Sequence, residues 1–292
     1  EYYQGRGDAR IRLEWRLLER ALIAEKLKDV DVVIACFGFT ETTEAEGRDR
    51  TFAMPAAEAE FMKAVFALDK PIVGVVNAGG NMYMQDWIDK VDALLWAWFP
   101  GQEGGTAIAE ILFGKSNPSG KLPVTFEKRW EDNPAFGSYH DPDGDKRVQY
   151  TEGIFVGYRG YDRNGTEVQY PFGYGLSYTD FQLSDIDLSP AGDGRVNVAC
   201  TLANTGAVAG AEVVQLYVGF PGSSVEMPPK ALKGYEKIYL EPGQSSRVYF
   251  TLEPRDFSYY DVVSQDFVPV PGVCEVMIGN SSRHISLRAA IE

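Results

Sequence analysis

The hydrophobic pattern changes its period along the chain. Between Leu17 and Phe126, apolar runs of strand length alternate with stretches in which apolar residues recur at helical spacing. Such alternation is typical of a parallel sheet covered by helices on both faces, so residues 17–126 are predicted to form an α/β sandwich with a mostly parallel sheet. The predicted strands are 31–37, 71–76 and 93–98, and the predicted helices are 17–27, a segment that begins at Pro55, and 105–113.

The second half of the chain follows a different pattern. Residues 127–183 are rich in Gly, Pro, Asn, Asp and Tyr and show no clear period, which predicts a loop-rich connector. Over residues 184–292 apolar and polar positions alternate in short runs that turn residues separate, with no helical stretch between them. This pattern predicts an antiparallel β-sandwich, with strands over 196–202, 213–218, 247–252 and 273–278.

Composition excludes several classes of function. The 292 residues contain 42 acidic and 28 basic side chains, a net charge of −14, which disfavours binding to nucleic acid or to anionic lipid. No apolar run reaches the ~18 residues that a membrane span needs, so no membrane insertion is expected. Three cysteines at wide spacing and two histidines form no recognisable metal or disulfide pattern, and neither a metal nor an organic cofactor is implied.

Charged residues are concentrated directly after the first predicted strand. The segment 40–50 contains four carboxylates and two arginines. In a parallel α/β sheet, ligands bind beyond the carboxyl ends of the strands, and a carboxyl near arginines can be tuned for proton transfer. A solvated, purely structural loop is the alternative, and composition does not decide between the two.

An ordered set of motifs adds a family resemblance. The motifs are 43–50, 100–105, 112–114, 117–123, 150–153, 157–159, 171–179, 204–206, 210–217 and 232–234. In this order they resemble the C-terminal half of the glycoside hydrolase family 3 β-glucosidases, which comprises an α/β sandwich domain and a fibronectin type III-like domain.

The resemblance implies a catalytic role for the segment 40–50. The family uses a retaining mechanism with an aspartate nucleophile and a glutamate general acid/base, and its Thr-Glu-x-x-Gly pattern places the acid/base at Glu44. Arg48, Asp49 and Arg50 are expected around that carboxyl as substrate-binding residues. Trp98, at the end of the third predicted strand, is a candidate wall of the cleft by its position, with a place in the core as the alternative.

The second catalytic carboxylate is expected outside this sequence. Retaining enzymes need carboxyl groups ~5–5.5 Å apart on opposite sides of the glycosidic bond, and Glu44 and Glu46 on one short loop cannot easily straddle a sugar. In the family the nucleophile lies in an N-terminal (β/α)8 barrel, so that barrel is the expected partner and the chain alone is expected to be inactive. The resemblance also suggests a periplasmic or secreted enzyme, and it is compatible with a homo-oligomer.

The substrate implied is a β-glucoside or oligosaccharide from which terminal non-reducing β-D-glucosyl units are removed. Related members cleave β-xylosides or α-L-arabinofuranosides, so these activities are alternatives. A catalytically silent carbohydrate-associated module, in which Glu44 is only a surface acid, is an alternative from a different class.

Two smaller expectations concern the ends of the chain. Residues 1–16 resemble the last strands of a PA14 domain, a module that some family 3 enzymes carry inside the α/β domain, with an ordinary β-hairpin as the alternative. Cys200 and Cys274 both fall on the apolar faces of their predicted strands. They are expected either to meet across the sandwich or to remain buried free thiols.

Overall fold

The computed structural model describes residues 2–4, 9–11, 25, 27–47, 49–139, 141 and 144–291. The chain divides into two compact units, residues 1–104 and 105–292, each of which is described by itself. No helix in the described ranges is long and apolar enough to span a membrane. The predicted domain boundaries at 16/17, 126/127 and 183/184 stay predictions.

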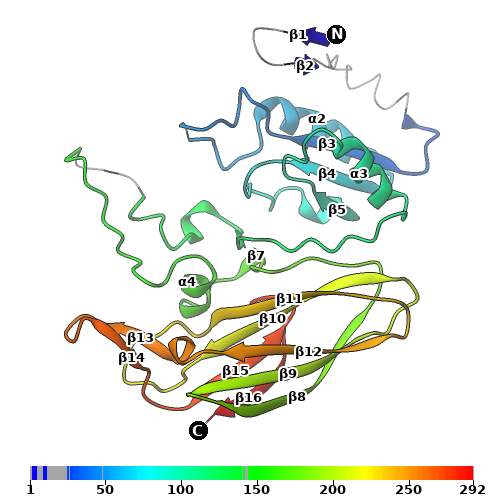
Figure 1. Cartoon of the computed structure of the whole chain (residues 1–292). Coiled ribbons are helices and arrows are strands. Elements are labelled where there is room, and N and C mark those ends of the chain that lie inside the picture. The colour runs from blue at the N-terminus through cyan, green and yellow to red at the C-terminus, as the bar shows by residue number, and fades with distance from the viewer. Residues whose placement is uncertain are drawn as a thin grey trace. The chain divides into compact units, whose positions relative to one another are not determined.

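The first unit contains the predicted parallel sheet. Its strands are β3 (Val33–Gly38), β4 (Ile72–Asn77) and β5 (Ala93–Trp96), in the order β3-β4-β5 (Figure 1). Both pairings are parallel, with Ile34 opposite Val73 and Val75 opposite Leu95. Apolar β-branched residues dominate β4, the central strand, as expected for a strand with neighbours on both sides.

Helix α2 (Ala56–Phe66) follows Pro55 and contacts β3. A proline fits at a helix start because the missing N–H would have no partner inside the helix. Met62 and Val65 are buried on its inner side. The short helix η1 (Ile88–Lys90) then leads into β5.

The expectation of burial on both faces fails for β3. Val33, Ala35 and Phe37 are buried, whereas Ile34 on the opposite face is 47% exposed. The predicted helix 17–27 falls mainly outside the described residues. The PA14 prediction also falls largely outside them, although β1 (Tyr2–Gln4) and β2 (Ala9–Ile11) pair as an antiparallel hairpin.

The second unit begins with a helix and the loop-rich connector. Helix α3 (Gly104–Leu112) starts at the end of the first unit, and Gly114, two residues after its last residue, has φ +71°, the left-handed conformation that often ends a helix. The connector is irregular as predicted, with short elements only. These are β6 (Phe126–Glu127), η2 (Trp130–Asp132), α4 (Tyr158–Arg163) and β7 (Val168–Tyr170), and β6 pairs with β7.

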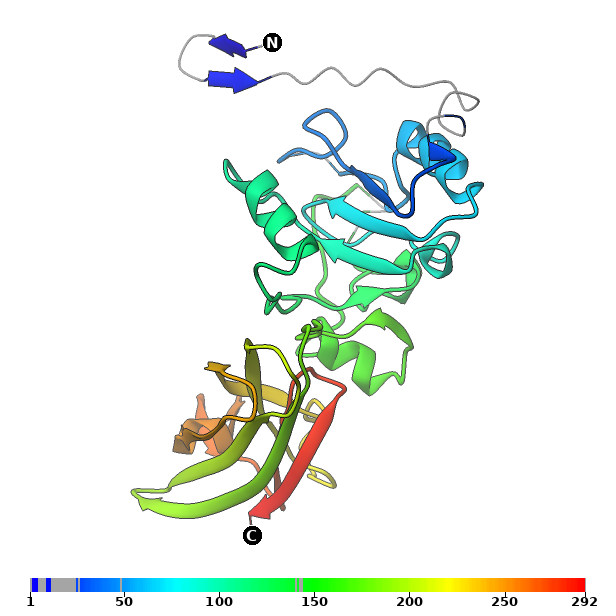
Figure 2. The same ribbon diagram turned by 90° about the vertical axis from the view of Figure 1, so that its right-hand side faces the viewer.

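The predicted β-sandwich is confirmed. One sheet has the order β12-β9-β8 and the other β11-β10-β15-β16, all antiparallel (Figures 1 and 2). Their bounds are β8 Phe181–Gly192, β9 Arg195–Asn204, β10 Gly210–Gly219, β11 Ala231–Leu240, β12 Ser245–Leu252, β15 Cys274–Gly279 and β16 Ile285–Ile291. Helix η3 (Pro254–Phe257) and the hairpin of β13 (Ser258–Asp261) and β14 (Asp266–Pro269) connect β12 to β15.

The core of the sandwich lies between these two sheets. Its members alternate along each strand with outward-facing residues, as period 2 requires. Val198, Leu216 and Ile278 are each less than 2% exposed. Cys200 and Cys274 are both buried in this core as free thiols, which decides between the two expectations for them.

The thiols provide a direct test of this core. Burial raises the pKa of Cys200 and that of Cys274 to about 11, and Ellman's reagent reacts with thiolate. At pH 8 the native chain is therefore expected to react at no more than one thiol, the exposed Cys36, and at all three thiols in urea. Stoichiometric reaction of a second thiol in the native protein would contradict the buried positions.

Candidate functional site

The ends of three parallel strands form the candidate site. Because β3, β4 and β5 run in the same direction, their carboxyl ends lie at one edge of the sheet. The segments that leave this edge are 39–50 after β3, 78–81 after β4 and 97–99 after β5. The charged segment identified in the sequence is therefore at the edge where ligands bind in this class of sheet.

Glycine at position 38 brings two of these segments together. Gly38 has φ +148°, and a Cβ built on it would lie 1.9 Å from the carbonyl oxygen of Asn77. That carbonyl accepts a hydrogen bond of 2.8 Å from the N–H of Phe39. Any side chain at position 38 would therefore separate the ends of β3 and β4.

A tight turn then fixes the backbone at Glu44. The carbonyl of Thr40 accepts hydrogen bonds from the N–H groups of Thr43 at 2.9 Å and Glu44 at 2.8 Å. The N–H of Thr40 in turn donates to the Thr43 hydroxyl at 2.8 Å. Thr43 thus stabilises this turn, because its hydroxyl forms a hydrogen bond with the nearby backbone of Thr40.

Both carboxylate oxygens of Glu44 have partners within the first unit. Oε1 lies 3.0 Å from Nε of Arg50, and Oε2 accepts a hydrogen bond of 3.0 Å from the N–H of Gly79. The side chains of Glu44 and Arg50 are only 19% and 17% exposed, respectively. Both oxygens of Glu44 are therefore already engaged by groups of the protein, which fixes the position of this carboxyl group.

Arg50 is itself held from several sides. Its guanidinium lies over the ring of Phe39, 4.3 Å from the centroid, and donates hydrogen bonds to the carbonyls of Asn81 and Thr51. A Cβ at position 80 would lie 2.9 Å from its Nη2 atom, so Gly80 leaves the room that Arg50 occupies. The prediction that Arg50 lies next to Glu44 is confirmed by this contact, while a role in binding substrate stays a prediction.

The other predicted residues differ in their surroundings. Glu46 and Asp49 are exposed on the same segment, and Arg48 lies outside the described residues. Trp98 follows β5 at the same edge, is partly buried and has φ +54°, and its carbonyl accepts a hydrogen bond of 3.0 Å from the side-chain amide of Asn77. A contact of Trp98 with sugar stays a prediction.

Sequence reasoning missed Gly79, whereas Phe99, next to Trp98 at the end of the third predicted strand, is a candidate wall of the cleft by its position, like Trp98. The N–H of Gly79 binds Glu44, and Phe99, 57% exposed, has its ring 3.2 Å from where a Cβ of Gly79 would lie. The signal for Gly79 was its place directly after a buried strand, which puts it at the same edge as segment 40–50. Among the described residues, no group of three His, Cys, Asp or Glu side chains gathers as a metal site.

A single added methyl group tests this arrangement. In Gly79→Ala the new Cβ would lie 2.8 Å from Oε1 of Glu44, so the carboxylate must move away from the Gly79 N–H. We expect faster proteolytic cleavage within segment 40–50, measured by limited digestion and mass spectrometry. Gly105→Ala, where a Cβ meets nothing within 4 Å, is the matched control. Equal cleavage rates for Gly79→Ala and wild type would contradict the Glu44–Gly79 contact.

Comparison with known proteins identifies two domains in the chain. The profile of the glycosyl hydrolase family 3 C-terminal domain matches residues 18–158, and that of the fibronectin type III-like domain matches residues 212–282. The chain is 42% identical over 283 residues to the thermostable beta-glucosidase B of Acetivibrio thermocellus, covering 96% of this chain and 37% of that protein. It is 36% identical to an exo-alpha-(1->6)-L-arabinopyranosidase of Bifidobacterium breve, covering 90% and 34%.

Solved structures agree with the fold. The crystal structure of a family 3 beta-glucosidase from Bifidobacterium adolescentis superimposes with a TM-score of 0.89 at 37% identity, over 95% of this chain and 42% of that chain. The beta-glucosidase 3B of Thermotoga neapolitana, in complex with alpha-D-glucose, gives a TM-score of 0.87 at 35% identity, over 96% and 40%. The chain thus spans about 40% of the length of these proteins.

Proposed function

We propose that the chain, whose residues 18–158 match the family 3 C-terminal domain, is part of a retaining, exo-acting β-glucosidase. The 42% identity to a beta-glucosidase over nearly the whole chain carries this proposal. The charged segment at the carboxyl edge of the parallel sheet would supply the general acid/base. The aspartate nucleophile would come from an N-terminal barrel, since the chain spans only 37% of that relative.

The proposed reaction has two steps. In the first, the aspartate attacks the anomeric carbon while the acid/base donates its proton to the departing glycosidic oxygen, which leaves a covalent glycosyl-enzyme and a free alcohol. In the second, the same group, now a carboxylate, takes a proton from water, whose oxygen attacks the anomeric carbon and releases the sugar and the aspartate. The acid/base must therefore carry a proton at the start and reach the glycosidic oxygen.

Two glutamates of the segment compete for that role. The Thr-Glu-x-x-Gly pattern favours Glu44, and this assignment stays a prediction. The contacts of the two side chains favour Glu46, because both oxygens of Glu44 are already engaged, one by Arg50 and the other by the N–H of Gly79. Glu46 is exposed two residues further on, directly before Gly47, whose φ of +77° turns the chain. We therefore propose Glu46 as the proton carrier and Glu44 as the residue that anchors its loop.

A second activity is favoured by one comparison. An exo-alpha-(1->6)-L-arabinopyranosidase is 36% identical to this chain, so hydrolysis of an arabinopyranoside by the same catalytic groups is the second candidate activity. The residues that select the sugar are proposed to lie in the barrel. The β-xyloside and α-L-arabinofuranoside alternatives rest on the family resemblance alone.

Activity measurements on the full-length protein and on the isolated 292-residue chain test the proposed function. The full-length protein is expected to hydrolyse 4-nitrophenyl β-D-glucopyranoside with net retention, observed by NMR of the first-formed anomer. It is expected to hydrolyse this glucoside faster than the corresponding 4-nitrophenyl α-L-arabinopyranoside. The 292-residue chain alone is expected to release no nitrophenol. Hydrolysis by the isolated chain would overturn the proposal of a nucleophile outside it, and an inactive full-length protein would support a silent accessory module.

A further inference from the structure

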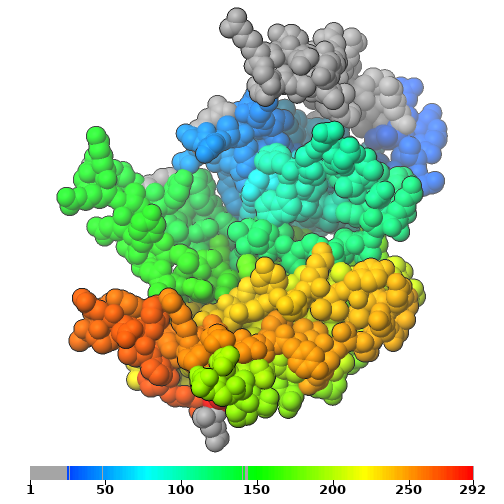
Figure 3. Space-filling view, viewed as in Figure 1, coloured from blue at the N-terminus to red at the C-terminus, as the bar shows by residue number. Residues whose placement is uncertain are grey.

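The β-sandwich has a hollow on its surface, far along the sequence from the segment 40–50. The outer face of sheet β12-β9-β8 carries a hollow of about 300 Å³. Its lining includes Asp187 and Ser189 of β8, Asn197 and Ala199 of β9, and Tyr249 and Thr251 of β12. The strands that form this sheet, yellow-green and orange, are visible at the surface in Figure 3.

Strand register explains why a hollow forms here. Ala199 lies opposite Asp187 on one side and opposite Tyr249 on the other. Neighbouring strands are about 4.8 Å apart, so Asp187 and Tyr249 stand about 10 Å apart with only a methyl group between them. Ala199 is thus the floor of the hollow, and the aromatic ring and the carboxylate are its two sides.

The next row along the sheet closes one end with polar groups. Asn197 lies opposite both Ser189 and Thr251, and its side-chain oxygen accepts a hydrogen bond of 3.0 Å from the Thr251 hydroxyl. That bond orients the Asn197 amide on the sheet face. Among the described residues, the side chains of Asp187 and Ser189 make no hydrogen bond, so they remain available to a ligand.

In the row beyond the other end of the hollow, the guanidinium of Arg247 already has hydrogen-bond partners in the protein. Arg247 lies opposite Thr201, and its Nη1 atom donates to the Thr201 hydroxyl at 3.1 Å and to the carbonyl of Asp185 at 2.6 Å. A phosphate or carboxylate ligand would need this guanidinium and would also meet Asp187. The hollow therefore disfavours anions.

These features together select a neutral, polyhydroxylated ring. Tyr249 is 69% exposed and offers an aromatic face to an apolar ring face, such as the C–H groups of a pyranose. Asp187, Ser189 and Asn197 offer acceptors and donors to hydroxyl groups. A volume of about 300 Å³ is at the small end of ligand sites, as expected for one sugar ring rather than a protein segment.

We propose that this hollow is an ancillary binding site for one pyranose unit of a glycan, with Tyr249 as the stacking platform and Asp187 as the main hydroxyl acceptor. The choice of a glucose-type ring rests on the proposed function, whereas the site itself does not. Such a site would hold a glycan chain near the enzyme without taking part in hydrolysis. Its affinity is expected to be weak, in the millimolar range, because one exposed ring face and a few hydrogen bonds contribute little free energy.

Binding to the 292-residue chain tests the proposal. Cellobiose is added as the probe, and saturation-transfer difference NMR and calorimetric titration are expected to show contact with its C–H protons and a measurable Kd. Tyr249→Ala and Asp187→Asn are each expected to weaken binding at least tenfold. Tyr235→Ala removes a tyrosine of similar exposure, 66%, on β11 of the other sheet, and is expected to bind like wild type. Circular dichroism and the thermal midpoint check that each variant is folded.

The outcomes separate this site from the catalytic segment. Glu44→Ala and Glu46→Ala are expected to leave cellobiose binding unchanged, and a loss in either would place the sugar at the segment 40–50 and overturn the proposal. The proposal would also be overturned if no binding were detected as cellobiose is raised from 50-fold the protein concentration to its solubility limit. Equal losses of binding in Tyr249→Ala and Tyr235→Ala would overturn it as well. The proposed hydrolytic function is judged separately by the activity of the full-length protein.

Discussion

Glu46→Ala in the full-length protein is expected to lower the rate on glucosides with poor leaving groups by about 10²–10⁴-fold, the usual contribution of a general acid. A dinitrophenyl glucoside, whose leaving group departs without protonation, should form the glycosyl-enzyme at nearly the wild-type rate. Its turnover would then be limited by the second step, where the base is missing. Azide is expected to restore turnover by attacking the anomeric carbon, with glycosyl azide as the product.

Glu44→Ala is the matched comparison on the same loop. Its expected loss does not depend on the leaving group and is not rescued by azide, because Glu44 is proposed to hold the loop through Arg50 and the Gly79 N–H rather than to move a proton. Arg50→Met should resemble it. The opposite assignment, with Glu44 as the acid/base, would be established if Glu44→Ala alone showed the leaving-group dependence and the azide rescue. Unchanged activity in both variants would remove the catalytic role from this segment.

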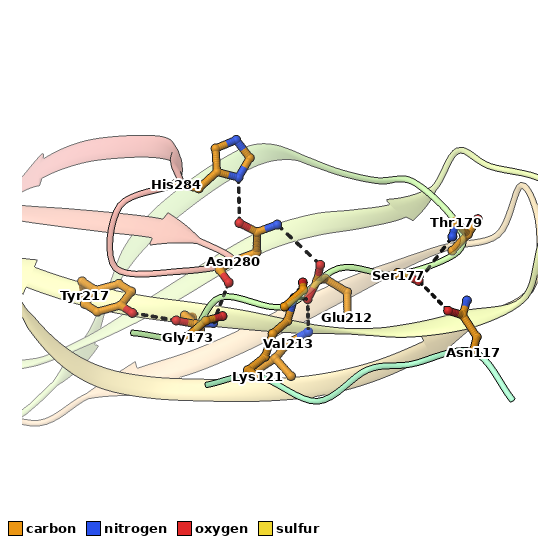
Figure 4. A network of polar contacts seen from close by, with 12 residues as sticks. Asn117, Lys121, Gly173, Ser177, Thr179, Glu212, Val213, Tyr217, Asn280 and His284 are labelled. Carbon is orange, nitrogen blue, oxygen red and sulfur yellow. Dashed lines mark hydrogen bonds and ion pairs between the residues drawn. The ribbon is translucent and has the colours of Figure 1, made fainter. Parts of the chain in front are cut away.

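The second large effect is expected at a buried ion pair between the connector and the sandwich. Nζ of Lys121 lies 2.6 Å from Oε1 of Glu212, and the side chains are 11% and 6% exposed (Figure 4). Lys121 also donates to the carbonyl of Gly175 at 2.6 Å, and Glu212 accepts from the N–H of Val213 at 2.6 Å. Removing one partner leaves the other charge buried, so Lys121→Met or Glu212→Gln is expected to destabilise the second unit by about 3–5 kcal/mol.

Urea unfolding followed by circular dichroism measures this loss. The double variant Lys121→Met/Glu212→Leu is expected to recover part of it, because no isolated charge remains. Lys128→Met, which removes an exposed pair with Glu167 on the same connector, is the control and is expected to leave the unfolding midpoint unchanged. Equal midpoints for Lys121→Met and Lys128→Met would show that the buried pair contributes no more than a surface pair.

Polar contacts next to this pair explain how the irregular connector is ordered. The side-chain amide of Gln215 donates to the carbonyls of Gly173 at 3.1 Å and Asn280 at 2.8 Å, and its oxygen accepts from the Tyr217 hydroxyl at 2.6 Å. Gly173 has φ +80°, and a Cβ there would lie 2.2 Å from the Gln215 oxygen. Long-range hydrogen bonds thus replace local periodicity in this part of the chain.

Local patterns were sufficient where neighbouring residues determine the structure. The apolar runs of β3, β4 and β5 and the alternation along β9, β10, β12 and β15 predicted those strands, because burial on a sheet face imposes a period that a sequence displays. Strand β11 was missed, since Lys233, Tyr235, Glu236 and Lys237 interrupt its apolar pattern. Antiparallel pairing with β10 places this segment in the sheet although its own apolar pattern is weak.

The sequence by itself determined the two kinds of sheet, the irregular connector between them and the charged segment at a strand end. Only the tertiary structure decided which glutamate of that segment is tied down, because the N–H of Gly79 lies 35 positions from Glu44 and approaches it only when β3 and β4 pair in parallel. It likewise decided that Lys121 and Glu212, which belong to separate motifs, form one buried pair. Periodicity is a property of adjacent residues, whereas these contacts depend on register between distant strands, which no local pattern records.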